Sequence, residues 1–290
     1  MASALVGSLP TFLGRGFGAM GLSGGIWTAL RMSGLVELRH RAFRALMREV
    51  DRVIALSRWT RELLLLNGVA PEKIVVSSQG LPARGLGEQP RGEALKEPPL
   101  RIAFLGRLDP SKGADVLIRA LLGLPSAAIE LHVYGIVQGD SDREHEKQLR
   151  ALAAADSRIT FRVAVPAEQV LTLLQSYHAV AVPSQVMETG PLVVLQAFAA
   201  GVPVVGSNLG GIAERVSHDA NGILVEPASI AAWRQALGRL AADPAALSRL
   251  RAGIRPPRVM AVIAREMLGI YRGLLRIDSC GREPQLRQVN

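Results

Sequence analysis

The sequence predicts an α/β fold built on a parallel sheet with helices on both faces. Short apolar runs rich in β-branched residues alternate with segments of helical period between residues 99 and 257. Such alternation is typical of strand–helix–strand units, whose crossovers are right-handed. Hydrophobic residues make up 49% of the 290 residues, which is enough for a large core and excludes a wholly disordered chain. We therefore expect one complete parallel-sheet domain, with partial structure before it.

The N-terminal segment differs from the rest of the chain. Residues 1–36 are rich in glycine and show no clear period, so we expect no long helix and poor order in part of the segment. Arg15 and Arg31 interrupt its apolar stretches before the roughly 18–20 residues that a membrane span needs. No basic stretch precedes the first apolar run, as it would in a signal peptide. We expect a cytoplasmic protein, either free or peripheral to a membrane.

Residues 37–52 are expected to form a basic amphipathic helix, because Arg41, Arg44, Arg48 and Arg52 recur at steps of three and four. The helix could contact anionic lipid, or its arginines could form an ordinary solvated face. After it the pattern predicts a strand at 52–57, a helix at 59–66 that ends at Asn67-Gly68, a strand at 73–77 and a linker at 80–99.

The alternation then becomes strict. Strands are expected at 101–105, 129–134, 159–163, 179–182, 202–205 and 222–225. Helices are expected at 114–122, 142–154, 167–175, 191–200, 211–216, 228–252 and 257–275. Ligands of such sheets bind at the carboxyl ends of the strands, so the loops that follow the strands are the places to search.

Composition narrows the partners. The chain has 34 Lys and Arg against 25 Asp and Glu, and the net charge of +9 favours anionic partners. Scattered arginines and only 4% aromatic residues argue against nucleic acid. The single cysteine, Cys280, excludes an intrachain disulfide and a cysteine-based zinc site. The histidines show no metal-ligand spacing, so we expect no metal and no other cofactor.

The first candidate loop, residues 106–113, follows the strand at 101–105. Gly106 allows a ligand to approach the backbone. Arg107 can hold phosphate oxygens in a planar fork, and Lys112 can act as a point charge. The spacing is not that of a P-loop. The pattern fits either a phosphate site or a solvated turn with two surface cations.

The second candidate loop follows the strand at 179–182. Pro191 fits the first turn of the next helix, where its missing N–H costs nothing. Free N–H groups near Gly190, Leu192 and Val193 would then form an anion site, helped by the helix dipole.

Two polar residues flank this helix start. The Glu188 carboxylate suits the hydroxyl groups of a sugar, because it accepts hydrogen bonds strongly. Gln196 lies near the second turn, on a face that could reach back to the ligand. Alternatively, Glu188 is a favourable charge near a helix N-terminus, and Gln196 is a surface amide.

The third candidate loop follows the strand at 202–205. Gly210 and Gly211 allow a positive φ and a close approach. Glu214 could simply cap the short helix that follows.

Together these residues resemble a known family. Residues 99–257 are similar to the donor-binding domain of retaining glycosyltransferases of family 4, which have the GT-B architecture. Residues 51–81 resemble the last part of that family's N-terminal domain. The resemblance rests on Gly106-Arg107-Leu-Asp-Pro-Ser-Lys112-Gly113, Pro183-Ser184 with Glu188-Thr-Gly190-Pro191-Leu192-Val-Val-Leu-Gln196, Gly210-Gly211-Ile-Ala-Glu214 and Asn221-Gly222-Ile-Leu-Val.

The resemblance implies a reaction. A sugar would pass from a nucleotide-sugar donor to a sugar, a lipid-linked or another small acceptor, with retained anomeric configuration and without metal. Arg107 and Lys112 would hold the donor diphosphate and stabilise the leaving group, and Glu188 would contact the donor sugar. Gln196 would face the ribose. The donor-binding residues that the resemblance implies are Gly106, Arg107, Lys112, Ser184, Glu188, Gly190, Pro191, Leu192 and Gln196.

The sequence departs from the family at two points. The family's E-x7-E motif ends here in Gln196, which loses the charge-assisted hydrogen bond of a second Glu and predicts weaker donor binding. The family's N-terminal domain is also longer than residues 1–98. We expect a partial N-terminal domain at 1–98, a donor domain at 99–257, and at 258–290 a helix that packs back on the N-terminal part, followed by a tail.

The shortened first domain leaves alternatives. The chain could be a fragment, the product of a gene with a misplaced start, or a degenerate member of the family. The alternative function is therefore a catalytically impaired remnant that still binds a nucleotide sugar.

Overall fold

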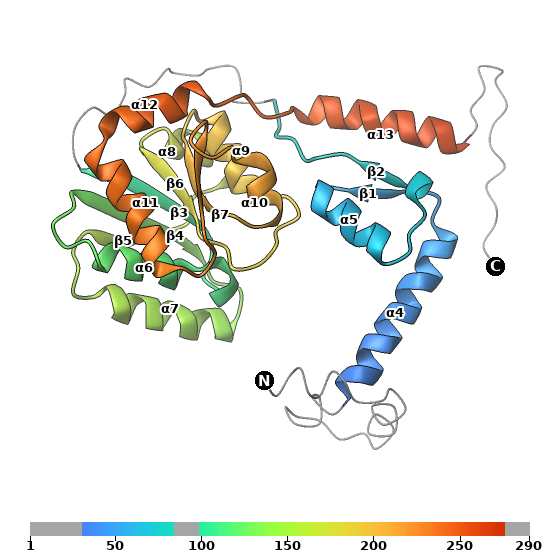
Figure 1. Cartoon of the computed structure of the whole chain (residues 1–290), viewed down its shortest axis with the longest axis horizontal. Helices are drawn as coiled ribbons and strands as arrows, with labels where there is room; N and C mark the ends of the chain where they lie inside the picture. The colour runs from blue at the N-terminus through green and yellow to red at the C-terminus, as the bar shows by residue number, and fades with distance from the viewer. Residues whose placement is uncertain (1–30, 84–98, 276–290) are drawn as a thin grey trace. The chain divides into compact units, whose positions relative to one another are not determined.

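The computed structural model describes residues 31–83 and 99–275 (Figure 1). The described residues fall into two compact units. One comprises residues 31–53 and 68–74, and the other comprises residues 54–67, 75–83 and 99–275. No helix in these described ranges is both long and apolar enough to cross a bilayer.

The larger unit is built on a six-stranded sheet in which each neighbouring pair of strands is parallel. The strand order is β5-β4-β3-β6-β7-β8. The strands are β3 (Leu100–Arg107), β4 (Ile129–Ile136), β5 (Ile159–Arg162), β6 (Ala179–Val182), β7 (Val204–Ser207) and β8 (Gly222–Val225). The chain runs outward from β3 to β5 and then returns to the other side of β3, so the direction of strand order reverses between β3 and β6. Crevices at such reversals are where ligands bind in α/β sheets.

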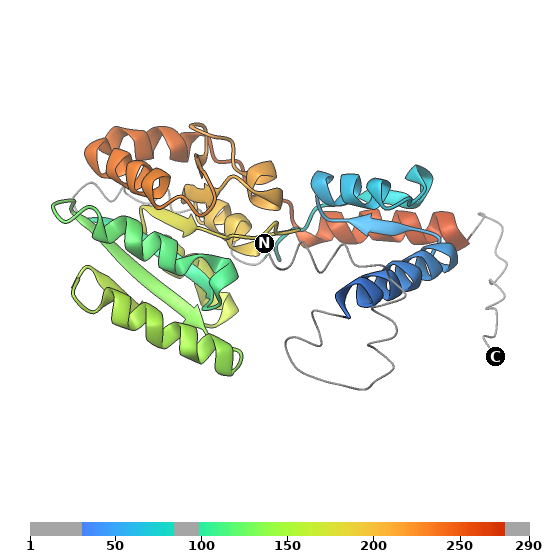
Figure 2. The ribbon, with the colours of Figure 1, turned by 60° about the horizontal axis from the view of Figure 1, so that its bottom comes forward.

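Helices cover both faces of this sheet, as the alternation predicts (Figure 2). One face packs against α6 (Ala114–Leu122), α7 (Asp140–Ala153), α11 (Ile230–Ala242) and α12 (Pro244–Ala252). The other face packs against α8 (Val170–Leu174), α9 (Leu192–Ala199) and α10 (Gly210–Arg215).

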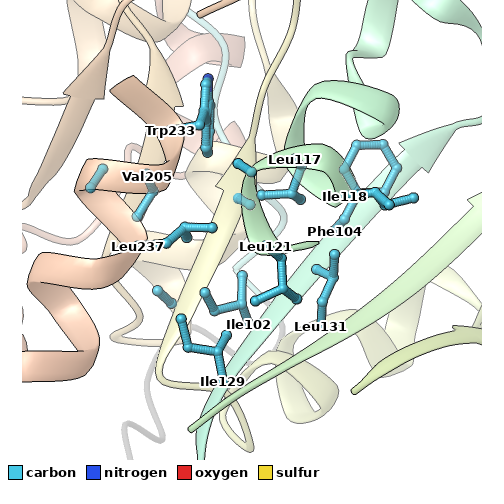
Figure 3. Packing of buried hydrophobic residues seen from close by; sticks show 14 of the residues in the cluster. Ile102, Phe104, Leu117, Ile118, Leu121, Ile129, Leu131, Val205, Trp233 and Leu237 are labelled. Carbon is cyan, nitrogen blue, oxygen red and sulfur yellow. The ribbon is translucent and has the colours of Figure 1, made fainter. Parts of the chain in front are cut away.

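The core of the first face is dense and apolar (Figure 3). Trp233 of α11 is fully buried, and Leu117 of α6 and Ile102 of β3 are each 1% exposed. Burial of such side chains is the main term that stabilises an α/β sheet. The loops that follow β3 and β6, where the strand order reverses, therefore extend from a well-packed sheet.

Residues 54–67 and 75–83 precede the six-stranded sheet and belong to the larger unit. Helix α5 (Arg58–Leu66) begins after Ser57, whose hydroxyl accepts the N–H of Thr60. Strands β1 (Val53–Ala55) and β2 (Ile74–Val76) form a two-stranded sheet. The expected elements at 59–66 and 73–77 are therefore confirmed to within a residue or two.

The C-terminal helix α13 (Met260–Leu275) follows a backbone bridge between Val259 and Leu81. Leu81 is only 6% exposed, although the sequence placed it at the start of a loop. Ser77 also donates to the carboxylate of Glu266 at 2.7 Å, and this bond lowers the pKa of Glu266. Residues 84–98 of the expected linker lie outside the described residues.

The smaller unit is built around α4 (Met32–Glu49), which begins five residues before the helix expected at 37. Gly34 is the one glycine within α4. A single interior glycine costs a helix only about 1 kcal/mol. The expectation of no long helix in residues 1–36 is therefore wrong for residues 32–36, which form the first turn of α4. Lys73 donates to the carbonyls of Met47 and Val50, at 2.9 Å and 2.7 Å, and so satisfies the open end of α4.

Candidate functional site

A cavity lies at the carboxyl ends of β3 and β6, where the strand order reverses. Its walls come from the ends of these two strands, the loops that follow them and the start of α9. The lining residues are Phe104, Leu105, Gly106, Lys112, Ala181, Val182, Pro183, Ser184, Glu188, Pro191, Leu192 and Val193. The structure thus brings together six of the nine residues that the sequence assigned to a donor site.

The loop after β3 folds into a tight turn that aims Lys112 at the neighbouring loop. Asp109 caps the 3₁₀ turn Pro110–Lys112 by accepting the N–H of Ser111 at 2.9 Å. Gly113 ends the turn with φ of 70°, a left-handed conformation that favours glycine. A side chain at Gly113 would also collide with the carbonyl of Pro183. The two loops therefore lie in direct contact.

Backbone hydrogen bonds join the same two loops. The N–H of Gln185 donates to the carbonyl of Ser111 at 2.7 Å. Ser184 is 1% exposed, and its hydroxyl points at the carbonyls of Ser111 and Val186, at 3.4 Å and 3.3 Å. Ser184 lines the cavity, but its hydroxyl orders the loops.

Lys112 and Glu188 form an ion pair across the cavity, with 2.9 Å between Nζ and Oε1. Their side chains are 24% and 17% exposed, so water screens the pair less than it would on an open surface. A cation and a carboxylate thus share one site. The cation can bind anionic oxygens, and the carboxylate can accept hydroxyl protons.

Arg107 does not join this pair in the described structure. Its guanidinium bonds Asp109 at 2.9 Å, the side chain is 46% exposed, and the residue does not line the cavity. Because the Arg107 side chain is long and solvent-exposed, it can pair with the carboxylate of Asp109, two residues further along the same loop.

The start of α9 supplies backbone donors. Pro191 is the N-cap, with φ of −70° and ψ of 99°, and the first helical residue is Leu192. The predicted helix start at 191 is therefore shifted by one residue. The first N–H groups of a helix have no partner within the helix, and here they belong to Leu192 and Val193, which line the cavity. Gln196 lies one turn further along, is half-buried and does not line the cavity.

Gly190 has a packing role that the sequence did not reveal. A Cβ at this position would collide with the side-chain amide of Gln79, a residue before the donor sheet. Gln79 went unnoticed because nothing in its local sequence marks it as a neighbour of this loop.

Of the roles that the sequence left open for Glu214, the helix cap is contradicted. Glu214 does not cap α10, whose N-cap is Leu209 without a side-chain bond. The carboxylate instead accepts the backbone N–H groups of Arg58 and Trp59 of α5, at 2.8 Å and 2.7 Å. The negative charge thus meets the positive end of another helix dipole.

Gly210 and Gly211 do provide the expected positive φ and close approach. Gly210 has φ of 46°, and a Cβ there would lie 3.0 Å from Cα of Met187. The N–H of Gly211 donates to the carbonyl of Glu188 at 2.7 Å. The close approach is to the loop that carries Glu188.

Trp59 also bonds this loop and was missed by the sequence analysis. Its indole Nε1–H donates to the carbonyl of Glu188 at 3.0 Å. The only sequence signal is a tryptophan in the first turn of a helix that begins at a Ser N-cap.

Within the described ranges, no group of three or more His, Cys, Asp or Glu side chains is placed to hold a metal ion. Metal independence stays a prediction.

Comparison with known proteins identifies relatives. Residues 87–255 match the family described as glycosyl transferases group 1. A D-inositol 3-phosphate glycosyltransferase of Nocardia farcinica is 31% identical over 214 residues, which are 70% of this chain and 47% of the relative. A protein of the same name from Acidothermus cellulolyticus is 30% identical over 265 residues, 80% of this chain and 56% of the relative. The chain spans about half the length of the curated relatives it matches.

Solved structures show the same architecture. HepE of Anabaena, in complex with UDP and glucose, has a TM-score of 0.69 and 21% identity over 81% of this chain and 66% of that one. Sucrose-phosphate synthase of Thermosynechococcus elongatus has a TM-score of 0.72 and 26% identity over 83% of this chain and 63% of that one. These neighbours are GT-B proteins, so the predicted fold class is confirmed.

Gly211→Ala tests how tightly α10 packs on the Glu188 loop. The new Cβ would lie 2.6 Å from the carbonyl oxygen of Glu188, so the loop must shift. We expect the free energy of unfolding to fall by about 1–3 kcal/mol in urea denaturation. Gly238→Ala in α11 is the matched control, because its Cβ would meet Leu124 at an ordinary 3.6 Å. The control should gain about 0.5–1 kcal/mol, since alanine favours the helix. Equal effects of the two changes would contradict the close packing.

Proposed function

Because the chain belongs to the glycosyl transferases group 1 family, we propose that it moves a sugar from a nucleotide-sugar donor to an acceptor. The Lys112–Glu188 pair at the strand reversal is the observation that carries the proposal. It places a cation for the donor diphosphate beside an acceptor for sugar hydroxyls.

Donor binding would exchange the partners of this ion pair. Diphosphate oxygens would replace the Glu188 carboxylate on Lys112, because a phosphate accepts strong charge-assisted hydrogen bonds. The carboxylate of Glu188 is then free to accept hydroxyl protons of the sugar. The open N–H groups of Leu192 and Val193 would add donors and the helix dipole to the anion site.

The same groups would stabilise the reaction. When the bond between the sugar and the diphosphate breaks, negative charge grows on the leaving phosphate. Lys112 and the start of α9 line the cavity in which we propose that this phosphate binds, and fixed donors of this kind stabilise developing charge. Arg107 would join them by leaving Asp109, since its loop already borders the cavity. Retention of the anomeric configuration and independence of metal enter the proposal from the family resemblance.

The relatives suggest which ligands to test first. HepE has been solved with UDP and glucose, which makes UDP the first nucleotide to try. The relatives named D-inositol 3-phosphate glycosyltransferases make that phosphorylated polyol a first acceptor. Sugars and lipid-linked acceptors follow.

A second candidate function is nucleotide-sugar binding without turnover. It is favoured by Gln196, which stands where the family has the second Glu of its motif. Transfer or hydrolysis of a bound donor by the full chain separates the two functions. Only an enzyme cleaves the bond between the sugar and the diphosphate and so forms free nucleoside diphosphate.

Helix α4 carries a separate proposal, contact with an anionic membrane. Arg39, Arg41, Arg44 and Arg48 are all exposed along it. We expect the full chain to sediment with vesicles containing phosphatidylserine and to lose this binding when the four arginines are changed to glutamine. Neutral phosphatidylcholine vesicles are the control. Equal sedimentation of the wild type and the four-glutamine variant would contradict the proposal and show that the arginines form an ordinary solvated face.

Calorimetric titration with UDP, GDP and ADP in the absence of metal tests the donor site. We expect micromolar binding of one nucleotide by the wild type. Lys112→Ala should weaken it by about tenfold or more, because a hydrogen bond to a charged group is lost. Arg107→Ala should weaken it as well. Lys147→Ala is the matched control, since its side chain is 77% exposed on α7. The proposal fails if no nucleotide binds or if Lys112→Ala matches the control.

Gln196→Glu tests the departure from the family motif. We expect nucleotide affinity to rise by about 1–2 kcal/mol, because a carboxylate accepts a ribose hydroxyl more strongly than an amide does. Calorimetry with the same nucleotide measures the gain. Gln235→Glu makes the same change at an exposed position of α11 and should leave the affinity as it is. An unchanged affinity in Gln196→Glu would show that residue 196 does not face the ribose.

A further inference from the structure

The backbone of Glu188 is held from outside its own loop. Its carbonyl oxygen accepts two hydrogen bonds, one from the indole of Trp59 at 3.0 Å and one from the N–H of Gly211 at 2.7 Å. Its carboxylate meanwhile pairs with Lys112. Both the side chain and the backbone of Glu188 are therefore held, the side chain by Lys112 and the backbone by Trp59 of α5 and Gly211 of α10.

Trp59 is fixed in turn by Glu214. The Glu214 carboxylate accepts the first two N–H groups of α5, those of Arg58 and Trp59, and Ser57 accepts the third. The Glu214 side chain is only 21% exposed, and its charge lies at the positive end of the α5 dipole. This anchors the helix start that carries the indole.

Close packing leaves the indole little freedom. A Cβ on Gly210 would lie 3.1 Å from Nε1 of Trp59 and 3.0 Å from Cα of Met187. The absence of a side chain at Gly210 is what lets the indole, α10 and the Glu188 loop meet.

We infer that Trp59 is a positioning residue of the donor site, which holds the backbone of Glu188 while Glu214 holds Trp59. The inference rests on the proposed function, in which Glu188 meets the donor sugar. The indole of Trp59 bonds the main chain of Glu188, and Lys112 bonds its carboxylate, so the indole acts on Glu188 directly and on the diphosphate site only through it. Trp59 therefore controls binding of the sugar part and leaves binding of the diphosphate part intact.

The test compares two affinities in each variant of the full chain. Calorimetry with UDP and with UDP-glucose, or with the matching pair for the nucleotide that the wild type binds, is done on Trp59→Phe, Glu214→Gln and Glu62→Gln. Trp59→Phe keeps an aromatic ring and removes the N–H donor. It should weaken the nucleotide sugar by about five- to tenfold and leave the nucleotide diphosphate unchanged.

The two glutamate variants complete the comparison. Glu214→Gln should shift the same affinity in the same direction by a smaller factor, because one acceptor oxygen remains. Glu62→Gln removes an equal charge from an exposed position of α5 and should change neither affinity. A merely structural role of Trp59 would weaken both ligands together. Equal loss of both, or no loss in Trp59→Phe, overturns the inference.

Amide hydrogen exchange separates this inference from the proposed function. If the wild type binds no nucleotide, the proposed function fails, but the hydrogen bonds can still be tested without ligand. Trp59→Phe should speed exchange of the Gly211 N–H at least about fivefold, since its acceptor loses a second anchor. Glu214→Gln should speed exchange at Arg58 and Trp59. Unchanged exchange at Gly211 in folded Trp59→Phe would show that the indole does not hold the loop.

Discussion

The reversal of strand order between β3 and β6 is the constraint on which the site depends. It places two loops from distant parts of the chain at one edge of the sheet. They are close enough for the N–H of Gln185 to bond the carbonyl of Ser111 and for Gly113 to lie against Pro183. Lys112 and Glu188 meet because of this contact. Neither loop alone contains both the cation and the carboxylate.

The Lys112–Glu188 pair explains how a partly buried cation and a partly buried carboxylate can share one cavity. A half-buried cation with no partner would be costly, and so would a lone carboxylate. Each neutralises the other at 2.9 Å. In the proposed function, an incoming diphosphate would offer the lysine a stronger partner and would release the carboxylate for neutral hydroxyls. The exchange favours a ligand with both parts, because a bare anion would leave Glu188 without its cation.

Local sequence signals predicted much of the fold and most of the candidate residues that line the cavity. Periodicity and glycine placement act over a few residues, so α6, β6 and β8 were placed to the residue. The carboxyl ends of parallel strands meet at one edge, which is why Lys112 and Glu188 could be assigned to one site. Arg107 could not be placed, because an exposed side chain can turn to any nearby carboxylate. A cap of its own helix was the local role considered for Glu214, because its true partners lie 155 and 156 residues away.

The glycine pair and Glu214 show why such partners matter. The sequence suggests that Gly210-Gly211 is an opening for a ligand, yet both glycines face the Glu188 loop, and Gly210 also faces Trp59. A donor sheet without α5 would leave the Glu214 carboxylate facing no helix N-terminus and the carbonyl of Glu188 with one donor in place of two. Among the described residues, neither of the two buried cores of the sheet includes a residue of α5. Helix α5 therefore contributes more to the geometry of the loop that carries Glu188 than to the core of the sheet.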